Sequence, residues 1–382
     1  MSEFIPLTTA VSYQRQPGPA AEELRRTLQG PELGFVLFFC SADYPLEALA
    51  KALNQAFDGL PMAGCTTAGE ITPDGYSQGC ITAIGFDRRG FAVEGTLIEQ
   101  LDPFSLTDAQ AQVEQLMRRC AERQIAPIKG NTFALTLLDG LSVQEELVLA
   151  ALNAALGSIP HFGGSAADEL QLIDTHVFFD GRFHTGAAVL LLFNTRCDFK
   201  VFSRHHMKPT DDKLVVTAAD SDQRRVMELN AEPAAQAYAE AVGLPLAALD
   251  HKAFALNPIA VRLGDDYYVR SIQQVNEDLS LSFYCAVENG IVLTVVKPGD
   301  IVEELRRQLA QLEQEIGTPQ LIIGCDCFLR RLEVEHKGLK AEISALLRDS
   351  RVIGFNTYGE QFAGMHINQT FTGVAIGSCP DE

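Results

Sequence analysis

Among the histidines of this chain, His366 has the surroundings best suited to chemistry. It lies in a segment with repeated glycines, Gly354 to Gly377, that reads GFNTYGEQFAGMHINQTFTGVAIG. The apolar runs at its two ends predict buried strands, so a polar turn carrying one imidazole is expected between them. A neutral imidazole ligates iron or copper well when a neighbouring polar group orients it, and Asn368 is near enough in sequence to do so. A buried histidine bonded to a carbonyl is the commoner arrangement, and both roles stay open.

Two further histidines compete for the same role. His161 precedes two glycines (PHFGG), and His184 lies in a turn (FHTG) directly before a predicted buried strand. Arg330 and Arg331 follow another strand and could hold carboxylates in bidentate fashion, or simply start a solvated helix. Cys325 and Cys327 are two residues apart on a strand, which favours two core side chains on one face over a metal or redox pair.

The familiar catalytic signatures are missing. The sequence contains no GxxxxGK[ST], no GxGxxG after a strand, no HExxH and no GxSxG. A thiol enzyme using Cys65 or Cys325 would need a base that the sequence does not place beside either. We therefore expect a protein that is not an enzyme.

An outline of helix, strand, helix, turn and strand occurs three times. In each copy a glycine precedes a glutamate by six residues, in the pairs Gly64 and Glu70, Gly163 and Glu169, Gly354 and Glu360. Three glutamates at equivalent places favour an architectural role over ligand binding. Internal repetition is the simplest account of this spacing.

The segment 196–297 departs from the outline. It predicts a long Ala-rich helix over 224–242 and three antiparallel strands over 267–275, 279–287 and 291–296. The expected fold is α/β, with two intimately packed halves whose mixed β-sheets are flanked by helices. Residues 1–200 would hold two repeated units, and residues 201–382 the β-rich segment and the third unit.

Composition narrows the function class. The 382 residues carry a net charge of −20, which argues against binding nucleic acid or an anionic membrane, because both need a basic face. No signal peptide and no 18-residue apolar run are visible. The nine cysteines are mostly scattered singly, which favours reduced thiols in a cytoplasm over a disulfide framework.

Several of these motifs together resemble a known family. GCTTAGEI, GGSAADE and GFNTYGEQ followed by HINQT are similar to the FIST family of bacterial signalling domains, as is AVRLGDDYYVRSIQQV from Ala260 to Val275. The resemblance spans Thr9 to Gly377. Chains made only of the two FIST halves include nitric-oxide-sensing haem proteins of the NosP type, which this sequence resembles in the GFNTYGEQ and HINQT motifs.

That resemblance implies a haem cofactor, nitric oxide as ligand and a histidine kinase as partner, with output to cyclic-di-GMP or biofilm control. It implies a haem site drawn from His366, His184, His161, Arg330, Tyr358 and Asn368, with His366 as the expected iron ligand. A homodimer would be compatible with it. The alternative is a FIST sensor for a small ligand such as an amino acid, without haem.

Overall fold

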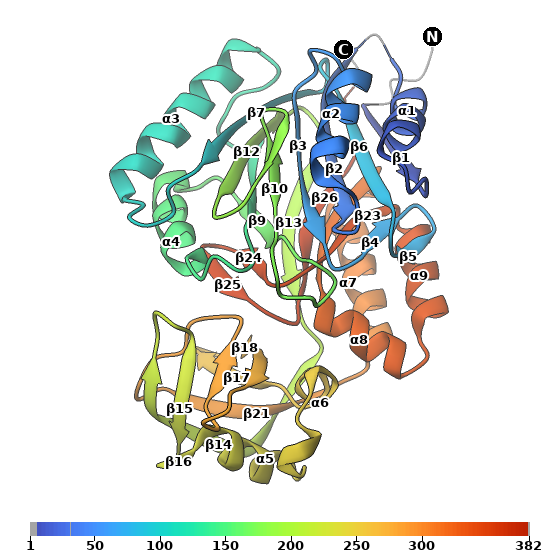
Figure 1. Ribbon diagram of the computed structural model, residues 1–382. Helices are drawn as coiled ribbons and strands as arrows, with labels where there is room; N and C mark the ends of the chain where they lie inside the picture. Colours follow the sequence, from blue (N-terminus) through green and yellow to red (C-terminus); the bar gives the residue numbers. More distant parts are fainter. Residues whose placement is uncertain (1–5, 31, 381–382) are drawn as a thin grey trace.

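The computed structural model describes residues 6–30 and 32–380, and it contains the three repeated units in full (Figure 1). Each unit runs strand, helix, strand, helix, strand, hairpin, strand, except that the third unit has two helices between its second and third strands. The first comprises β1 (Leu7–Ser12), α1 (Pro17–Thr27), β2 (Leu33–Ser41), α2 (Leu46–Ala56), β3 (Met62–Thr67), β4 (Glu70–Thr72), β5 (Gly75–Ser77) and β6 (Ile81–Asp87).

The second unit comprises β7 (Phe91–Ile98), α3 (Leu106–Glu122), β8 (Thr132–Leu138), α4 (Glu145–Leu156), β9 (His161–Ser165), β10 (Val177–Phe179), β11 (Arg182–His184) and β12 (Ala188–Thr195). The third comprises β13 (Phe199–Arg204), α7 (Ile301–Ile316), β22 (Leu321–Cys327), α8 (Phe328–His336), α9 (Lys340–Asp349), β23 (Val352–Thr357), β24 (Glu360–Phe362), β25 (Met365–Ile367) and β26 (Phe371–Ile376). The expected α/β fold with repeated units and mixed sheets is confirmed.

The three units exchange their hairpins. Their sheets have the equivalent orders β1-β6-β2-β3-β10-β11, β7-β12-β8-β9-β24-β25 and β13-β26-β22-β23-β4-β5. Hairpin β4–β5 of the first unit thus extends the sheet of the third, β10–β11 of the second extends the first, and β24–β25 of the third extends the second. Figure 1 shows the red hairpin β24–β25 reaching the green second unit beside α4.

A ring of three backbone hydrogen bonds joins the units where these hairpins leave their strands. The amide of Ala68 donates to Asn356 O (3.0 Å), that of Tyr358 to Ser165 O (3.3 Å), and that of Ala167 to Thr66 O (3.0 Å). Each unit gives one donor and one acceptor from equivalent positions, so the ring closes on itself.

The repeated glycines lie inside strands, where the backbones approach closely. A Cβ on Gly64 would lie 2.4 Å from Phe38 O, one on Gly163 2.2 Å from Thr136 O, and one on Gly354 1.8 Å from Gly324 O. Glycine is needed there because any side chain would collide with the parallel neighbouring strand.

The inner faces of the three sheets share one core, which includes a stacked pair, Phe39 and Phe355, with ring centroids 4.4 Å apart. The helices cover the outer faces through separate apolar clusters. Helix α3 begins with a capping box between Ser105 and Asp108, and the side chain of Asp300 caps α7.

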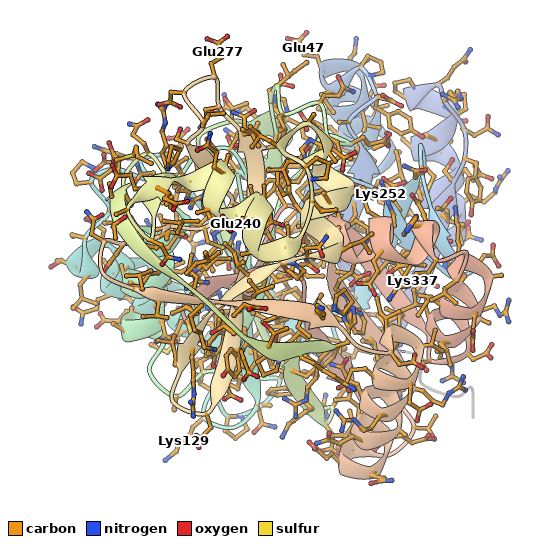
Figure 2. The ribbon with its side chains drawn as sticks, turned by 90° about the horizontal axis from the view of Figure 1, so that it is seen from below. Glu47, Lys129, Glu240, Lys252, Glu277 and Lys337 are labelled. Atoms are coloured by element: carbon orange, nitrogen blue, oxygen red, sulfur yellow. A yellow bond between two sulfur atoms is a disulfide. The ribbon has the colours of Figure 1, made fainter. Side chains whose placement is uncertain are left out.

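An insertion between β13 and α7 packs below the three units (Figure 1). It comprises β14 (Met207–Asp220), β15 (Arg225–Leu229), β16 (Glu232–Pro233), α5 (Ala234–Val242), a 3₁₀ turn (Leu246–Ala248), α6 (His251–Leu256), β17 (Ile259–Leu263), β18 (Asp266–Arg270), β19 (Ile272–Val275), β20 (Leu281–Phe283) and β21 (Val292–Pro298). The view from below shows it covering that end of the molecule, with Glu240 on α5 and Lys252 on α6 (Figure 2).

One predicted helix of this region is wrong in its first half. Residues 225–229 form β15 instead, paired with β14 and β20, and the helix begins only at Ala234. Pairing with two strands overrides the helical preference of this short stretch. Within the described residues, no helix is both long and apolar enough to cross a membrane.

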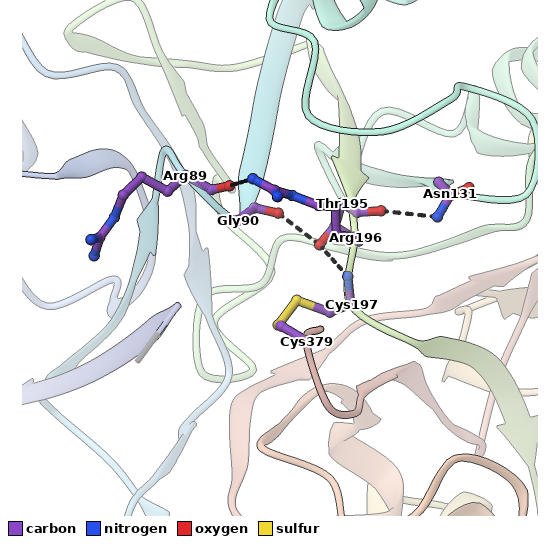
Figure 3. Close-up of a disulfide and its surroundings, with 7 residues drawn as sticks. All are labelled: Arg89, Gly90, Asn131, Thr195, Arg196, Cys197 and Cys379. Carbon is purple, nitrogen blue, oxygen red and sulfur yellow. Dashed lines mark hydrogen bonds between the residues drawn. A yellow bond between two sulfur atoms is a disulfide. The ribbon is translucent and has the colours of Figure 1, made fainter. Parts of the chain in front are cut away.

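The expectation of reduced thiols is wrong for one pair, because Cys197 forms a disulfide with Cys379 (Figure 3). Strands β13 and β26 pair antiparallel from Phe199 opposite Ile376, so the residues flanking them are brought together although they are 182 positions apart. The amide of Cys197 donates to Thr195 Oγ1 (3.1 Å). The other seven cysteines, all within the described residues, are free and buried.

We expect Cys379→Ser to lower the free energy of unfolding by about 2–5 kcal/mol, because the crosslink restricts a long loop of the unfolded chain. Urea titrations with and without reductant measure this difference. Reductant should bring the wild-type protein down to the stability of the variant. Equal stability of the two proteins without reductant would contradict the crosslink.

Candidate functional site

His366 lies on β25 at the junction of the second unit, the third unit and the insertion. Its imidazole is buried, with Nδ1 3.3 Å from Glu146 Oε1 on α4. Glu146 Oε1 also accepts from the amide of Ala286 (2.8 Å), and Glu146 Oε2 accepts from Arg224 (2.5 Å). Burial alone would lower the pKa of His366, but Cys285, Glu145 and Glu146 outweigh it and hold that pKa well above its usual value.

Asn368 does not orient the imidazole directly. Its Oδ1 accepts from Cys285 Sγ (3.0 Å) and from the amide of Ser271 (3.0 Å), and its Nδ2 donates to Tyr358 O (3.3 Å). Cys285 Sγ also lies 3.6 Å from the carbonyl of His366. Asn368 therefore reaches His366 through Cys285, and together they attach hairpin β24–β25 to the insertion.

Tyr358 holds the loop between β9 and β10. Its hydroxyl donates to Asp168 and accepts from the amide of Leu170 (2.9 Å). Asp168 in turn accepts from the amides of residues 172–174, and Glu169, Leu170 and Leu172 have positive φ. The ring packs against Tyr284 and Phe328. Its position between loop and core gives Tyr358 a structural role.

Arg330 corrects the expectation of a ligand-holding arginine. It is 4% exposed on α8, donates to Asp326 Oδ1 (2.6 Å) and lies 2.9 Å from His206 Nδ1. His206 Nε2 is in turn 2.7 Å from Glu333 Oε2. This guanidinium is committed to a buried ion network and is not open to a ligand.

His161 is enclosed beneath β24. Its Nε2 lies 2.7 Å from Thr136 Oγ1, which donates to Gln361. Burial lowers the pKa of His161 to about 4, so the imidazole is neutral near pH 7. Its Nδ1 has no hydrogen-bond partner in the described part of the chain.

The surroundings of His366 do not fit a haem iron. A Cβ on Gly359 would lie 1.9 Å from His366 Nε2, so the glycine backbone closes that side of the ring. Glu146 faces the other nitrogen. The expectation that His366 ligates haem is therefore not supported by this geometry, because neither nitrogen faces a space that a macrocycle could enter.

His184 is the predicted histidine that lines a cavity. The cavity has a volume of about 1020 Å³ and lies between β7, the start of β2 and hairpin β10–β11. Its apolar lining includes the partly exposed Phe179 and Leu97, and behind it lie Phe35, Phe86 and Phe91 of the shared core. His184 Nε2 lies 3.2 Å from Phe179 O, an arrangement in which the ring N–H bonds a carbonyl and Nδ1 keeps its lone pair.

The same cavity is lined by charged groups of both signs, namely Arg88, Arg119, Arg123 and Arg182 together with Glu94, Glu99 and Asp180. Arg123 pairs with Glu94 (3.0 Å) and Arg88 with Glu32 (2.7 Å). Arg119 and Arg182 have no ion-pair partner within residues 6–30 and 32–380. Partly exposed apolar side chains with guanidinium groups beside them suit a ligand that has both apolar and anionic parts.

The repeated glutamates secure the hairpins. Glu360 accepts from Thr357 Oγ1 before its hairpin and from the amide (3.0 Å) and hydroxyl (2.9 Å) of Thr370 after it. Glu70 is bonded equivalently, to Thr67 and Cys80. Burial raises the pKa of each carboxyl to about 7. Glu169, at the third equivalent position, is partly exposed and accepts from Ser41 Oγ (3.2 Å).

Sequence reasoning missed Glu146 and Cys285, which contact His366, and Arg224, which donates to Glu146. They lie on an ordinary helix start, after a short strand and in a turn, and no spacing connects them. It also missed the arginines of the cavity, which come from three separate elements. Only the tertiary fold brings either group together.

Comparison with known proteins adds the following. Residues 34–232 match the model of the FIST N domain, and residues 234–363 match that of the FIST C domain. A comparison with curated proteins gave no match. The solved structure of PurLQS from Thermotoga maritima aligns with 97% of this chain and 72% of its own at 10% identity, with a TM-score of 0.19, too low to indicate a shared fold.

We expect Gly359→Ala to destabilise the protein by about 1–3 kcal/mol, because the added methyl group would displace the imidazole of His366 from Glu146. Urea titration measures the loss. Gly18→Ala is the control, since a Cβ there meets nothing within 4 Å. Equal stability of Gly359→Ala and wild type would show that the imidazole has room to move.

The two buried glutamates predict a stability that falls as pH rises. Because the folded state keeps their protons up to a pKa of about 7, unfolding releases protons between about pH 4.5 and 7, and the free energy of unfolding decreases across that window. We expect Glu360→Gln to reduce this decrease by up to about 3 kcal/mol.

Urea titrations at pH 5 and pH 8 test the expected slope. Glu169→Gln is the matched control, because it makes the same substitution at the equivalent, partly exposed position. The same pH dependence in Glu360→Gln and wild type would contradict the assignment.

Proposed function

The chain belongs to the FIST family of signalling sensor domains, and on that premise we propose that it senses nitric oxide through haem bound in the cavity beside His184. The observation that carries this proposal is the carbonyl-bonded imidazole of His184 on the wall of that cavity. Among the expected haem ligands, His366 and His161 are enclosed by their own partners.

The cavity supports the proposal by its chemistry. Haem, when bound, supplies a metal position for a diatomic gas, which offers too little surface to be recognised by contacts alone. Phe179 and Leu97 would supply apolar contacts to the ring of the cofactor. Arg119 and Arg182 would hold the propionates, and the carbonyl of Phe179 would fix the ring of His184 with Nδ1 as the ligating atom.

The exchanged hairpin gives such a site a route to the rest of the molecule. His184 lies on β11, whose partner β10 pairs with β3 of the first unit. The loop leading into β10 is bonded to Tyr358 of the third unit through Asp168 and Leu170. A shift of His184 would therefore act on all three units. By the family resemblance, we propose a histidine kinase as the partner that reads this change, with output to cyclic-di-GMP and biofilm control.

A sensor for a small zwitterion is the second candidate. The cavity that holds the arginines also holds Glu94, Glu99 and Asp180, so it offers groups for both an ammonium and a carboxylate. An amino acid would use both kinds of group, and haem would use only the arginines. In this second candidate function the binding site is the same cavity, and the ligand is an amino acid instead of haem.

We expect the protein, reconstituted with haem and reduced anaerobically, to show a Soret band that shifts on adding nitric oxide. His184→Ala should lose or displace that band, because it removes the proposed ligand. The exposed His336 provides the control variant His336→Ala, which should keep the wild-type spectrum.

Two results would contradict the haem proposal. A normal spectrum in His184→Ala would overturn the placement of haem in this cavity. No band at near-stoichiometric haem, combined with a thermal shift on adding amino acids that Arg182→Ala abolishes, would replace the haem proposal by the small-ligand one. Autophosphorylation of the partner kinase, measured with and without nitric oxide, tests the output.

A further inference from the structure

We propose that Glu146, Cys285 and His366 form a binding site for one divalent transition metal, and that Zn²⁺ is the ion it suits best. The ligand atoms of these residues all lie within 4.8 Å of one another. This site is separate from the cavity of His184 and does not depend on haem.

The distances in the cluster are those of a small tetrahedral site. Zinc bonds nitrogen, oxygen and sulfur at about 2.0–2.3 Å, so two ligand atoms of a tetrahedral site lie about 3.3–3.8 Å apart. His366 Nδ1 and Glu146 Oε1 are 3.3 Å apart, at the outer limit for a hydrogen bond but suited to two ligands of one zinc. Small movements would bring Cys285 Sγ to the same distance.

The surroundings fix which atoms face the metal. Gly359 closes the Nε2 side of His366, so Nδ1 is directed at the cluster. Arg224 binds Oε2 of Glu146, which leaves Oε1 on the side of the imidazole. The amide of Ala286 holds that oxygen in place (2.8 Å). Groups that orient metal ligands in this way are a regular part of metal sites.

The chemistry of the set favours zinc over harder cations. One thiolate, one imidazole and one carboxylate bind Zn²⁺ well, whereas Mg²⁺ and Ca²⁺ prefer oxygen ligands. Three protein ligands leave a fourth position for water or for Asn368 Oδ1, which already lies 3.0 Å from Cys285 Sγ. Arg224 and Glu145, 2.6 Å apart, balance each other beside the site.

The ligands come from three parts of the chain. Glu146 is on α4 of the second unit, Cys285 follows β20 of the insertion, and His366 is on the exchanged hairpin of the third unit. A metal there would fasten the insertion to both units at once. Its binding should therefore stabilise the docked insertion.

Titration of the chelator-treated full-length protein with Co²⁺ tests the site, because a tetrahedral cobalt–thiolate gives visible bands and a thiolate charge-transfer band. We expect one Co²⁺ per chain, displaced by Zn²⁺. Cys285→Ser should lose the charge-transfer band and weaken Zn²⁺ binding by more than the 10–100-fold that loss of a merely orienting group costs. Cys120→Ser, at a buried cysteine on α3, is the control and should keep both.

Further readouts make the result decisive. Zn²⁺ should raise the melting temperature of wild type and Cys120→Ser, and not that of Cys285→Ser. An equal rise in all three, or unchanged Zn²⁺ affinity in Cys285→Ser and Glu146→Gln, would overturn the site, as would wild-type protein without stoichiometric metal. Far-UV circular dichroism of each variant establishes folding. His184→Ala should keep its cobalt bands, so the metal and haem proposals stand or fall separately.

Discussion

The closed ring of backbone hydrogen bonds among Ala68, Ala167 and Tyr358 is the constraint on which the architecture depends. Each amide donates to a carbonyl at a strand end of another unit. Backbone hydrogen bonds alone therefore hold the three strand ends together. Every hairpin that follows must then leave toward a neighbour, and all three extend a sheet that is not their own. Buried backbone groups need partners, and here the partners lie in other units.

This geometry decides where ligands can bind. Near the ring, strand ends and hairpins are packed so tightly that imidazoles such as His161 and His366 are enclosed by threonine, glutamate and glycine. Open space occurs farther out, where hairpin β10–β11 faces β7 across an arginine-lined cavity. Imidazoles near the ring are thus enclosed, whereas the imidazole of His184 lies at a cavity.

The sequence predicted what repeats locally and missed what depends on distant partners. Strand, helix and glycine spacings predicted three units, because the parallel strands need glycine at each close approach. The exchange of hairpins could not be predicted, because strands that pair across hundreds of residues show no characteristic spacing in the sequence. The sequence leaves two roles open for Arg330, because its partner His206 is 124 residues away. It does not point to Glu146, because Glu146 is 220 residues from His366. Residues 225–229 had helical composition but lie between two strands.

The exchanged hairpins also bear on how the protein is made. Hairpin β4–β5 is synthesised long before β23, the strand with which it pairs. Until β23 is made, the nascent chain carries hairpin β4–β5 without the strand that it pairs with, while the sheet of the first unit is extended earlier by β10 of the second. Unpaired edges of this kind are sites of aggregation, and long-range pairing slows folding. No unit can therefore complete its own strand pairing before a strand of another unit is present.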